Sequence, residues 1–363
     1  MKNPFKFGTV VDEPYFINRK SEIGKVQSVL GSENHLILMS PRRFGKSSLI
    51  YKAVSNLDRP VIATDMQLVT GPADFSAQIL KRIYRLWPAE KLKQHIKKFR
   101  VVPSLALNPV TGNIDVSFMP LADHLPLLED VLNLAEKLST ERRKIIMIFD
   151  EFQDAKRIHP DLLHQMRAII QRHKMVNYVF LGSQESLIRE IFQKKKSPFY
   201  HFGIVMNLSK ISAAEFREFL KAGFRDLCRD ADALADEIIA VTKCHPYYTQ
   251  QLAFTVWEKA ALKSESEELV SEAVREQLLI HDMDYERIWT GFNTTDRKML
   301  LGISLSELQP LSDAFNRAWN TGAPSTAFSS LKRLMTDGFV IKTDRYEIDD
   351  PFFSRWLAER RER

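Results

Sequence analysis

Five short segments that are apolar almost throughout constrain the fold of this chain more than any other feature of its sequence. They lie at residues 35–39, 61–65, 144–149, 178–182 and 203–208. Such segments, unlike strands with alternating polarity, are typical of a parallel sheet that is buried on both faces. Helical patterns fill the intervals, including residues 47–56, 73–87, 125–139 and 160–173. The alternation predicts an α/β fold with a doubly wound parallel sheet.

One segment interrupts this alternation. Residues 99–119 have an extended pattern, and Asn-Pro-Val-Thr-Gly-Asn at residues 108–113 is a turn signal between two short strands. A β-hairpin inserted into the sheet domain is the simplest interpretation.

After residue 209 the pattern becomes helical. Four helices are predicted at residues 213–226, 230–243, 247–264 and 267–286, and a boundary is expected near Gly291. Three more helices follow at residues 296–302, 308–320 and 325–337, and then two short strands at residues 338–342 and 345–348. Three helices followed by a β-hairpin are typical of a winged helix. We therefore expect a sheet domain at 1–208, a helical lid at 209–288 and a winged-helix domain at 289–363.

Composition excludes several classes of protein. A chain of 363 residues with 44% hydrophobic and 27% charged residues resembles a soluble globular protein of two or three domains. It has no apolar run near the roughly 20 residues of a membrane span, and no signal core at its start. The two cysteines, Cys228 and Cys244, do not have metal-ligand spacing. We expect a cytoplasmic protein without a membrane span.

The net charge of +6 is concentrated in clusters at residues 91–100, 194–196 and 360–363. Clusters of this kind can attract nucleic acid or acidic membranes, but they are more often solvated faces. The charge by itself does not select a partner.

The clearest local motif is Ser-Pro-Arg-Arg-Phe-Gly-Lys-Ser-Ser at residues 40–48, between a buried strand and a helix. It matches the phosphate-binding loop GxxxxGK[ST], except that Ser40 replaces the first glycine. In such a loop, backbone N–H groups and the helix N-terminus surround phosphates. Gly45 would allow a close approach, Lys46 would bridge the β- and γ-phosphates, and Ser47 would bind magnesium. The alternative is an ordinary turn with a chance Gly-Lys-Ser.

Two acids follow the strand at residues 144–149. In P-loop ATPases, an acid at this place holds the magnesium hydration shell and the next glutamate polarises the attacking water. Asp150 and Glu151 suit these roles, and they stand where ligands bind in open α/β sheets. The alternative is a strand that simply ends in exposed charge.

Polar residues also follow the next predicted strand. Ser183, or else Gln184, could contact the γ-phosphate or the attacking water as a sensor. An equally good interpretation is a cap for the helix that follows at residues 185–192.

Taken together, these motifs resemble the archaeal and bacterial AAA ATPase family, of the AAA+ and STAND type. The resemblance rests on FxxRxxE[IL], PRRxGK[ST]SL, DE[FI][QP], GHP[YF][YL]xQxL and DPx[FL]xx[WY][LF]-like segments at residues 16–23, 41–49, 148–153, 245–252 and 350–357. It spans nearly the whole chain.

The resemblance implies a P-loop NTPase sheet domain, a helical lid and a C-terminal winged helix around one site for ATP or ADP and Mg²⁺. The loop residues implied to hold the nucleotide are Pro41, Arg42, Arg43, Phe44, Gly45, Lys46, Ser47 and Ser48. Phe16 and Arg19 would lie near the adenine. His245 and Pro246 would approach the nucleotide from the lid, although taken by itself His245 reads better as a helix cap.

Three positions depart from the family pattern. Ser40 and Cys244 replace glycines, and His201 stands where an arginine often occurs. A glycine lost from a strained backbone angle would be costly. Because an arginine near the γ-phosphate accelerates turnover strongly, we expect slow hydrolysis or none.

The function favoured by these observations is an ATPase with catalytic Lys46, Glu151 and Ser183 that acts as a nucleotide-dependent conformational switch on a protein partner or by self-assembly. One alternative is a DNA-binding AAA+ ATPase similar to origin-recognition and helicase-loader proteins, reading duplex DNA with the helix at 325–337. That helix carries Lys332 and Arg333, and the wing carries Lys342 and Arg345, which is a thin basic footprint. The other alternative is a module that binds ATP without hydrolysing it.

Overall fold

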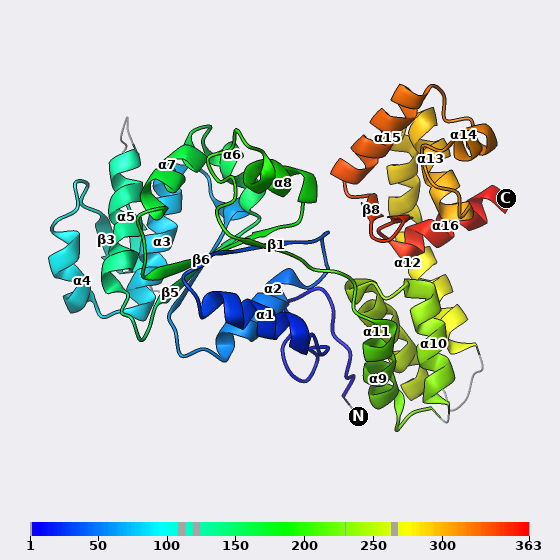
Figure 1. Ribbon diagram of the computed structural model, residues 1–363. Helices are drawn as coiled ribbons and strands as arrows, with labels where there is room; N and C mark the ends of the chain where they lie inside the picture. The colour runs from blue at the N-terminus through cyan, green and yellow to red at the C-terminus, as the bar shows by residue number, and fades with distance from the viewer. Residues whose placement is uncertain (1, 108–113, 119–123, 229, 263–267, 363) are drawn as a thin grey trace. The chain divides into compact units, whose positions relative to one another are not determined.

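The computed structural model describes residues 2–107, 114–118, 124–228, 230–262 and 268–362 (Figure 1). The chain forms two compact units. The first, the sheet unit, comprises residues 20–40 and 49–208. The second, the helical unit, comprises residues 1–19, 41–48 and 209–363.

The sheet unit is built on five parallel strands. They are β1 (Leu36–Met39), β2 (Val61–Asp65), β5 (Ile145–Asp150), β6 (Val176–Gly182) and β7 (Ile204–Asn207). Their order across the sheet is β2-β5-β6-β1-β7. The predicted parallel sheet is confirmed. Since all five strands run in one direction, β1, β5 and β6 end at the same edge, and Met39 is in register with Gly182.

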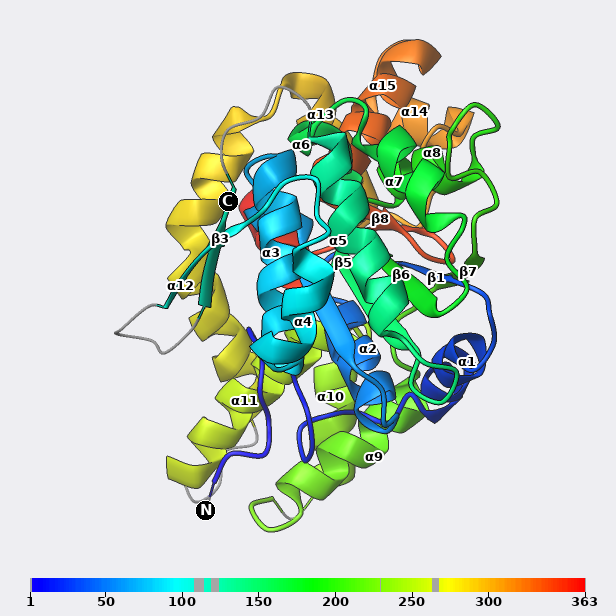
Figure 2. The same ribbon diagram turned by 90° about the vertical axis from the view of Figure 1, so that its left-hand side faces the viewer.

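Helices cover both faces of this sheet (Figures 1 and 2). One face carries α3 (Pro72–Leu86), α5 (Leu125–Leu138) and α7 (Leu162–Ile170), and the other carries α1 (Lys20–Leu30) and α2 (Lys46–Ser55). Beyond α3 lie α4 (Ala89–Ile96) and the antiparallel pair β3 (Ser104–Leu107) and β4 (Ile114–Ser117). The predicted turn at 108–113 lies outside the described residues.

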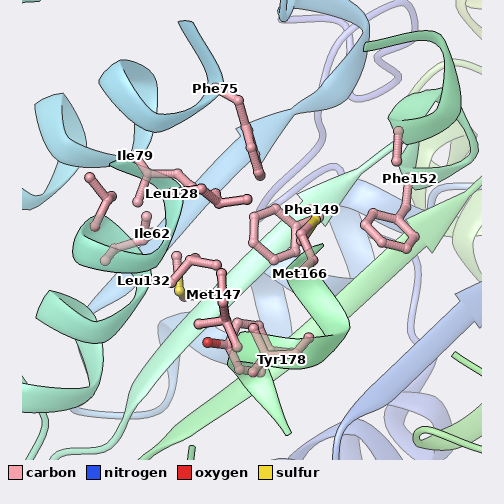
Figure 3. Packing of buried hydrophobic residues seen from close by; sticks show 14 of the residues in the cluster. Ile62, Phe75, Ile79, Leu128, Leu132, Met147, Phe149, Phe152, Met166 and Tyr178 are labelled. Carbon is pink, nitrogen blue, oxygen red and sulfur yellow. The ribbon is translucent and has the colours of Figure 1, made fainter. Parts of the chain in front are cut away.

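The core between the sheet and α3, α5 and α7 is rich in aromatic rings (Figure 3). Phe149 of β5 packs at ring-centroid distances of 5.6 Å from Phe75 and 5.8 Å from Phe180. Phe152, just beyond β5, is fully buried and lies 4.6 Å from Phe180. Burying each such side chain stabilises the fold by about 1.5–3 kcal/mol. This packing fixes the segment that follows β5.

Short elements complete the sheet unit. They are η1 (Met66–Leu68), η2 (Phe152–Asp154), α6 (Ala155–Ile158) and α8 (Glu185–Gln193). The sequence patterns did not predict α1 or α4. Helix α4 is short and highly charged, so a cluster of lysines obscured its buried residues, Leu92 and Ile96.

The helical unit contains the predicted lid helices and winged helix. The lid helices are α9 (Ala213–Phe224), α10 (Ala231–Thr242), α11 (Pro246–Leu262) and α12 (Leu269–Gly291). The winged helix consists of α13 (Thr294–Leu305), α14 (Asp313–Trp319), α15 (Pro324–Thr336), β8 (Val340–Lys342), β9 (Tyr346–Ile348) and α16 (Pro351–Glu362). One buried cluster runs through both groups of helices.

Two details of the helical unit differ from the sequence patterns. Residues 308–312 are not helical, because Ser312 caps α14 by accepting a hydrogen bond from the Phe315 N–H. Helix α16 follows the wing directly, although no helix was expected there. Its first amides are capped by Asp350, whose Oδ1 accepts from Phe352 N at 2.8 Å. Among the helices of the described ranges, none is both long and apolar enough to cross a bilayer.

A half-buried histidine directly before β1 gives the sheet unit a pH-dependent stability. The ring of His35 packs against Phe202 at 4.6 Å, and its Nδ1 accepts from Tyr178 N at 3.3 Å. Burial, followed by the charges of Arg167 and His173, lowers its pKa from 6.5 to about 4. The folded chain therefore keeps His35 neutral while the unfolded chain protonates it.

We predict that the free energy of unfolding falls as the pH drops through the window from 6.5 to 4, by about 2 kcal/mol between pH 7 and pH 5. Urea unfolding at both pH values measures this loss. His35→Gln should reduce the loss, leaving the part due to His173, whose pKa burial also lowers. Substitution of the exposed His164 by glutamine should leave it unchanged, and equal pH dependence in all three proteins would contradict the assignment.

Candidate functional site

The loop at residues 41–48 joins β1 to α2. Its left-handed residues are Arg43, at φ 63°, and Gly45, at φ 84°. Ser40 is not among the residues with positive φ; it is fully buried, and its N–H donates to Gly182 O at 3.3 Å as an extension of the sheet. The expected penalty for losing glycine at position 40 is therefore absent. The first N–H groups of α2 follow directly and form the kind of helix N-terminus that binds anions.

The three side chains at the end of this loop differ in burial and in their hydrogen-bond partners. Lys46 is only 6% exposed, and its Nζ donates to Pro41 O at 3.1 Å, which closes the loop with a positive charge inside it. Ser47 lies half-buried in the first turn of α2. The hydroxyl of Ser48 instead accepts from Val11 N at 3.0 Å, so Ser48 anchors the N-terminal segment.

The middle of the loop contacts helix α11. Arg43 Nη1 donates to the Tyr248 hydroxyl at 3.1 Å, and its guanidinium lies 4.5 Å from the centroid of Tyr247. The Phe44 ring meets His245 edge-on at 4.9 Å. Thus two adjacent loop residues bind the start of one lid helix.

His245 links the loop, the lid and the winged helix. It is 1% exposed, and its Nδ1 accepts from Tyr247 N at 3.2 Å, so the helix-cap interpretation is confirmed. Its Nε2 lies 3.4 Å from Asp349 Oδ1, just before α16. Pro246 is the first residue of α11. The implied approach of His245 and Pro246 to a nucleotide stays a prediction, while the contact of His245 with Phe44 places it beside the loop.

Arg19 also supports the loop. Its side chain is 3% exposed, and Nη2 donates to Phe44 O at 3.1 Å and to Ser209 O at 3.0 Å. These bonds tie the loop to the segment before α9. Phe16 is half-buried nearby in sequence. The expected position of Phe16 and Arg19 near an adenine stays a prediction.

The acidic pair lies at the end of β5 in the sheet unit. Asp150 is half-buried, and its Oδ1 accepts from Glu151 N at 2.9 Å. Asp65, at the end of β2, is in register with Asp150, so both carboxylates occupy one face of the sheet. Burial, and then the charge of Asp150, raise the pKa of the Tyr51 phenol on α2. The two carboxylates make this edge a candidate for binding a cation, although the charge of Arg82 on α3 opposes them at Tyr51.

A magnesium ion would find few protein ligands here. No group of three or more His, Cys, Asp or Glu side chains forms a metal site within the part of the chain that the structure describes. Mg²⁺ commonly binds through one or two side chains, with waters and phosphates completing its shell. The assignment of Ser47 and Asp150 as the magnesium ligands stays a prediction.

Glu151 and Ser183 are brought together. Glu151 has left-handed backbone angles, φ 49° and ψ 47°. Its Oε2 accepts from Ser183 Oγ at 2.6 Å and from Ser183 N at 3.2 Å. The capping alternative is wrong, because Gln184 is the N-cap of α8 and provides no side-chain cap. Sequence reasoning also missed Gln153, whose Nε2 donates to Glu151 Oε2 at 2.5 Å.

Two expectations remain, one about the missing arginine at position 201 and one about basic residues of the winged helix that could contact DNA. His201 is exposed and stacks on Tyr200 at 3.9 Å. On α15, Arg333 is tied to the buried Asp296 at 2.7 Å, whereas Lys332 is exposed. In the wing, Arg345 pairs with Glu307. These pairs reduce further the basic surface available for DNA.

Comparison with known families identifies the chain. Residues 16–252 match the family described as "ATPase domain predominantly from Archaea". The chain belongs to this family. Residues 283–359 of this archaeal-type ATPase match a second family, described as "Probable winged helix domain". Family and fold together make it an archaeal-type ATPase with a P-loop NTPase sheet and a C-terminal winged helix.

Solved structures agree with this archaeal-type ATPase fold. A Walker-type ATPase of Pyrococcus abyssi is 18% identical, with a TM-score of 0.68, over 98% of this chain and 99% of that chain. The ORC2 protein of Aeropyrum pernix, in its ADPNP–ADP complexes, is 15% identical, with a TM-score of 0.56, over 99% of this chain and 100% of that chain. At these identities the similarity establishes the fold. A comparison with curated proteins finds no match.

Cys244 gives this archaeal-type ATPase a local strain. It has a φ of 58° directly before His245, at the position where the motif that the sequence resembles has glycine. A left-handed conformation costs a residue with a Cβ about 1–2 kcal/mol, and more if the side chain is β-branched. We predict that Cys244→Gly unfolds at or above the wild-type temperature, and that Cys244→Val is about 2 kcal/mol less stable than the glycine variant. Thermal unfolding measures both, and equal stabilities would contradict this account.

Proposed function

We propose that the chain binds ATP with Mg²⁺ at the loop of residues 41–48 and at Asp150, hydrolyses it slowly, and uses the nucleotide state as a conformational switch. The observation that carries the proposal is the position of the loop. It leaves β1 at the sheet edge where β5 ends in Asp150 and Glu151. Ligands of open parallel sheets bind at such an edge.

Each residue has a chemical role in this proposal. Backbone N–H groups around Gly45 and the start of α2 receive the phosphates, and the Lys46 ammonium turns from Pro41 O to the β- and γ-phosphates. Ser47 and Asp150 would hold magnesium, which when bound neutralises charge on the phosphates. Glu151 accepts the proton of the attacking water. A histidine at position 201, in place of the arginine often found there in the family that the sequence resembles, supports slow turnover.

The switch follows from the contacts of the loop. Arg43 bonds to Tyr248, and the Tyr248 ring packs edge-on against Phe352 of α16 at 5.8 Å. Phe44 packs against His245, which faces Asp349. A loop that changes shape around phosphates therefore acts on the lid and the winged helix through two side-chain pairs. A protein partner, or a second copy of the chain, would respond to that change.

The DNA-binding alternative has weaker support. It depends on phosphate contacts by α15 and the wing, where Arg333 and Arg345 are engaged with Asp296 and Glu307. Salt-dependent binding of duplex DNA that is lost on substitution of Lys332 would favour it over the switch.

We predict that Lys46→Ala weakens Mg-ATP binding about 10- to 100-fold, because a charge-assisted bond to phosphate is lost. Isothermal titration measures the affinity. Substitution of the exposed Lys25 on α1 by alanine is the matched control and should bind as wild type does. Equal affinities of the Lys46 variant and wild type would contradict the proposed site.

Glu151→Gln should bind ATP but lose turnover, because the proposed base is removed. Unchanged turnover would mean that Glu151 has no catalytic role.

Coupling to the winged helix has its own test. Tyr248→Phe removes the bond to Arg43 but keeps the ring beside Phe352. We predict ATP affinity within about threefold of wild type, because the substitution leaves the Arg43 charge and the loop backbone in place. The ATP-induced change in amide exchange across α16 should shrink. Tyr247→Phe, which keeps its ring under Arg43, should retain that change. Identical exchange in wild type and the Tyr248 variant would exclude this route.

A further inference from the structure

The carboxylate of Glu151 accepts its side-chain hydrogen bonds through one of its two oxygens, Oε2. Three donors converge on Oε2: Gln153 Nε2 at 2.5 Å, Ser183 Oγ at 2.6 Å and Ser183 N at 3.2 Å. None of these donors is directed at Oε1. The backbone of Glu151 is left-handed, at φ 49°, which a residue with a side chain rarely adopts. Outliers of this kind concentrate at functional sites, where the surrounding structure enforces them.

Gln153 is built rigidly into the core. It lies in η2, directly after Phe152, whose fully buried ring packs between Phe180 at 4.6 Å and Phe199 at 5.5 Å. The Gln153 side chain is itself 4% exposed. The amide can only point its nitrogen at Glu151, because the reverse orientation would bring Oε1 against the carboxylate. Its position is therefore set by packing before any nucleotide arrives.

A glutamine at position 153 destabilises the core in ways that an apolar side chain of the same size would not. Gln153 Oε1 is buried and has no hydrogen-bond partner in the described residues. It also needs Gly182, since a Cβ there would lie 2.8 Å from Oε1 and 2.1 Å from Ile188. A methionine would fill the same space without burying an unsatisfied acceptor. The amide is thus explained by the bond that it makes to Glu151.

We propose that Gln153 is a positioning residue that, together with Ser183, anchors Oε2 so that Oε1 of Glu151 acts as the base. This inference rests on the proposed ATP hydrolysis. In the step, the water oxygen bonds to the γ-phosphorus as the bond to the bridging oxygen breaks, ADP leaves with that electron pair, and the water proton passes to Oε1. Ser183 then orients the base instead of sensing the γ-phosphate. Fixing a base in a productive geometry is a large part of such catalysis.

The first test removes the amide. Gln153→Met should lower kcat about 10- to 100-fold, with the KM for ATP within twofold of wild type, because the base is present but no longer oriented. Its unfolding temperature should not fall, since the unsatisfied acceptor is gone. The exposed Gln193 on α8 supplies the control, and Gln193→Met should keep the wild-type kcat. Combining Gln153→Met with Ser183→Ala should cost less than the product of the two single effects, because both residues act on one oxygen.

The second test uses pH, which a purely structural role would not move. In Gln153→Glu two carboxylates face each other, so one binds a proton more tightly. When protonated, the new side chain donates to Oε2 as the amide did. The kcat of this variant should therefore recover as the pH falls from 8 to 6, whereas the wild-type kcat does not rise.

The outcomes separate the two proposals. An unchanged kcat and pH profile in the Gln153 variants, with turnover abolished by Glu151→Gln, would overturn the positioning role and leave the ATPase assignment intact. An increased kcat for Gln153→Met would also overturn it, since the bond would then restrain Glu151. Absence of ATP hydrolysis by the wild-type chain would overturn both.

Discussion

The parallel pairing of β1 with β6 and of β6 with β5 is the constraint on which the rest of the structure depends. It brings the ends of three strands to one edge of the sheet. Ser40 continues the ladder by bonding to Gly182, so the loop at residues 41–48 starts from a fixed point. Asp150 and Glu151 end the strand next to β6, and Ser183 follows β6 itself. The site residues of the sheet unit are therefore positioned by backbone hydrogen bonds, and the apolar packing on both faces keeps those bonds dry.

In each of the two units, several of the predicted site residues or their chain neighbours are held in unfavourable local states. Glu151, Arg43 and Cys244 have left-handed backbone angles without being glycine. Gln153 and His245 each bury a polar atom without a partner in the described residues. Such features cost stability wherever they occur, and the aromatic core around Phe152 and Phe180 offsets them.

The helical unit connects the loop with the winged helix through a small number of aromatic residues. Tyr248 contacts Arg43 of the loop and Phe352 of α16, and His245 contacts Phe44 of the loop and Asp349 just before α16. Burial, and then the charges of Asp350 and Asp349, raise the pKa of Tyr248, so its phenol stays neutral and serves as a partner for Arg43 at any physiological pH. Side-chain contacts thus connect the loop with the winged helix of this archaeal-type ATPase, as the proposed nucleotide switch requires.

The sequence by itself determined the fold class, the strands and the identity of the loop and the acids, because each of these depends on local periodicity or on a contiguous motif. The parallel strands at residues 61–65 and 144–149 could be predicted from their continuous apolar character. The hydrogen bonds between side chains of separate elements became visible only in the folded chain. Ser183 donates a hydrogen bond to Glu151 and does not cap a helix, and Arg19 donates to the carbonyl of a loop residue, Phe44. Gln153 lies beside Glu151, the proposed base. No pattern in the sequence carries these pairings, since they arise only where packing brings distant residues within hydrogen-bonding distance.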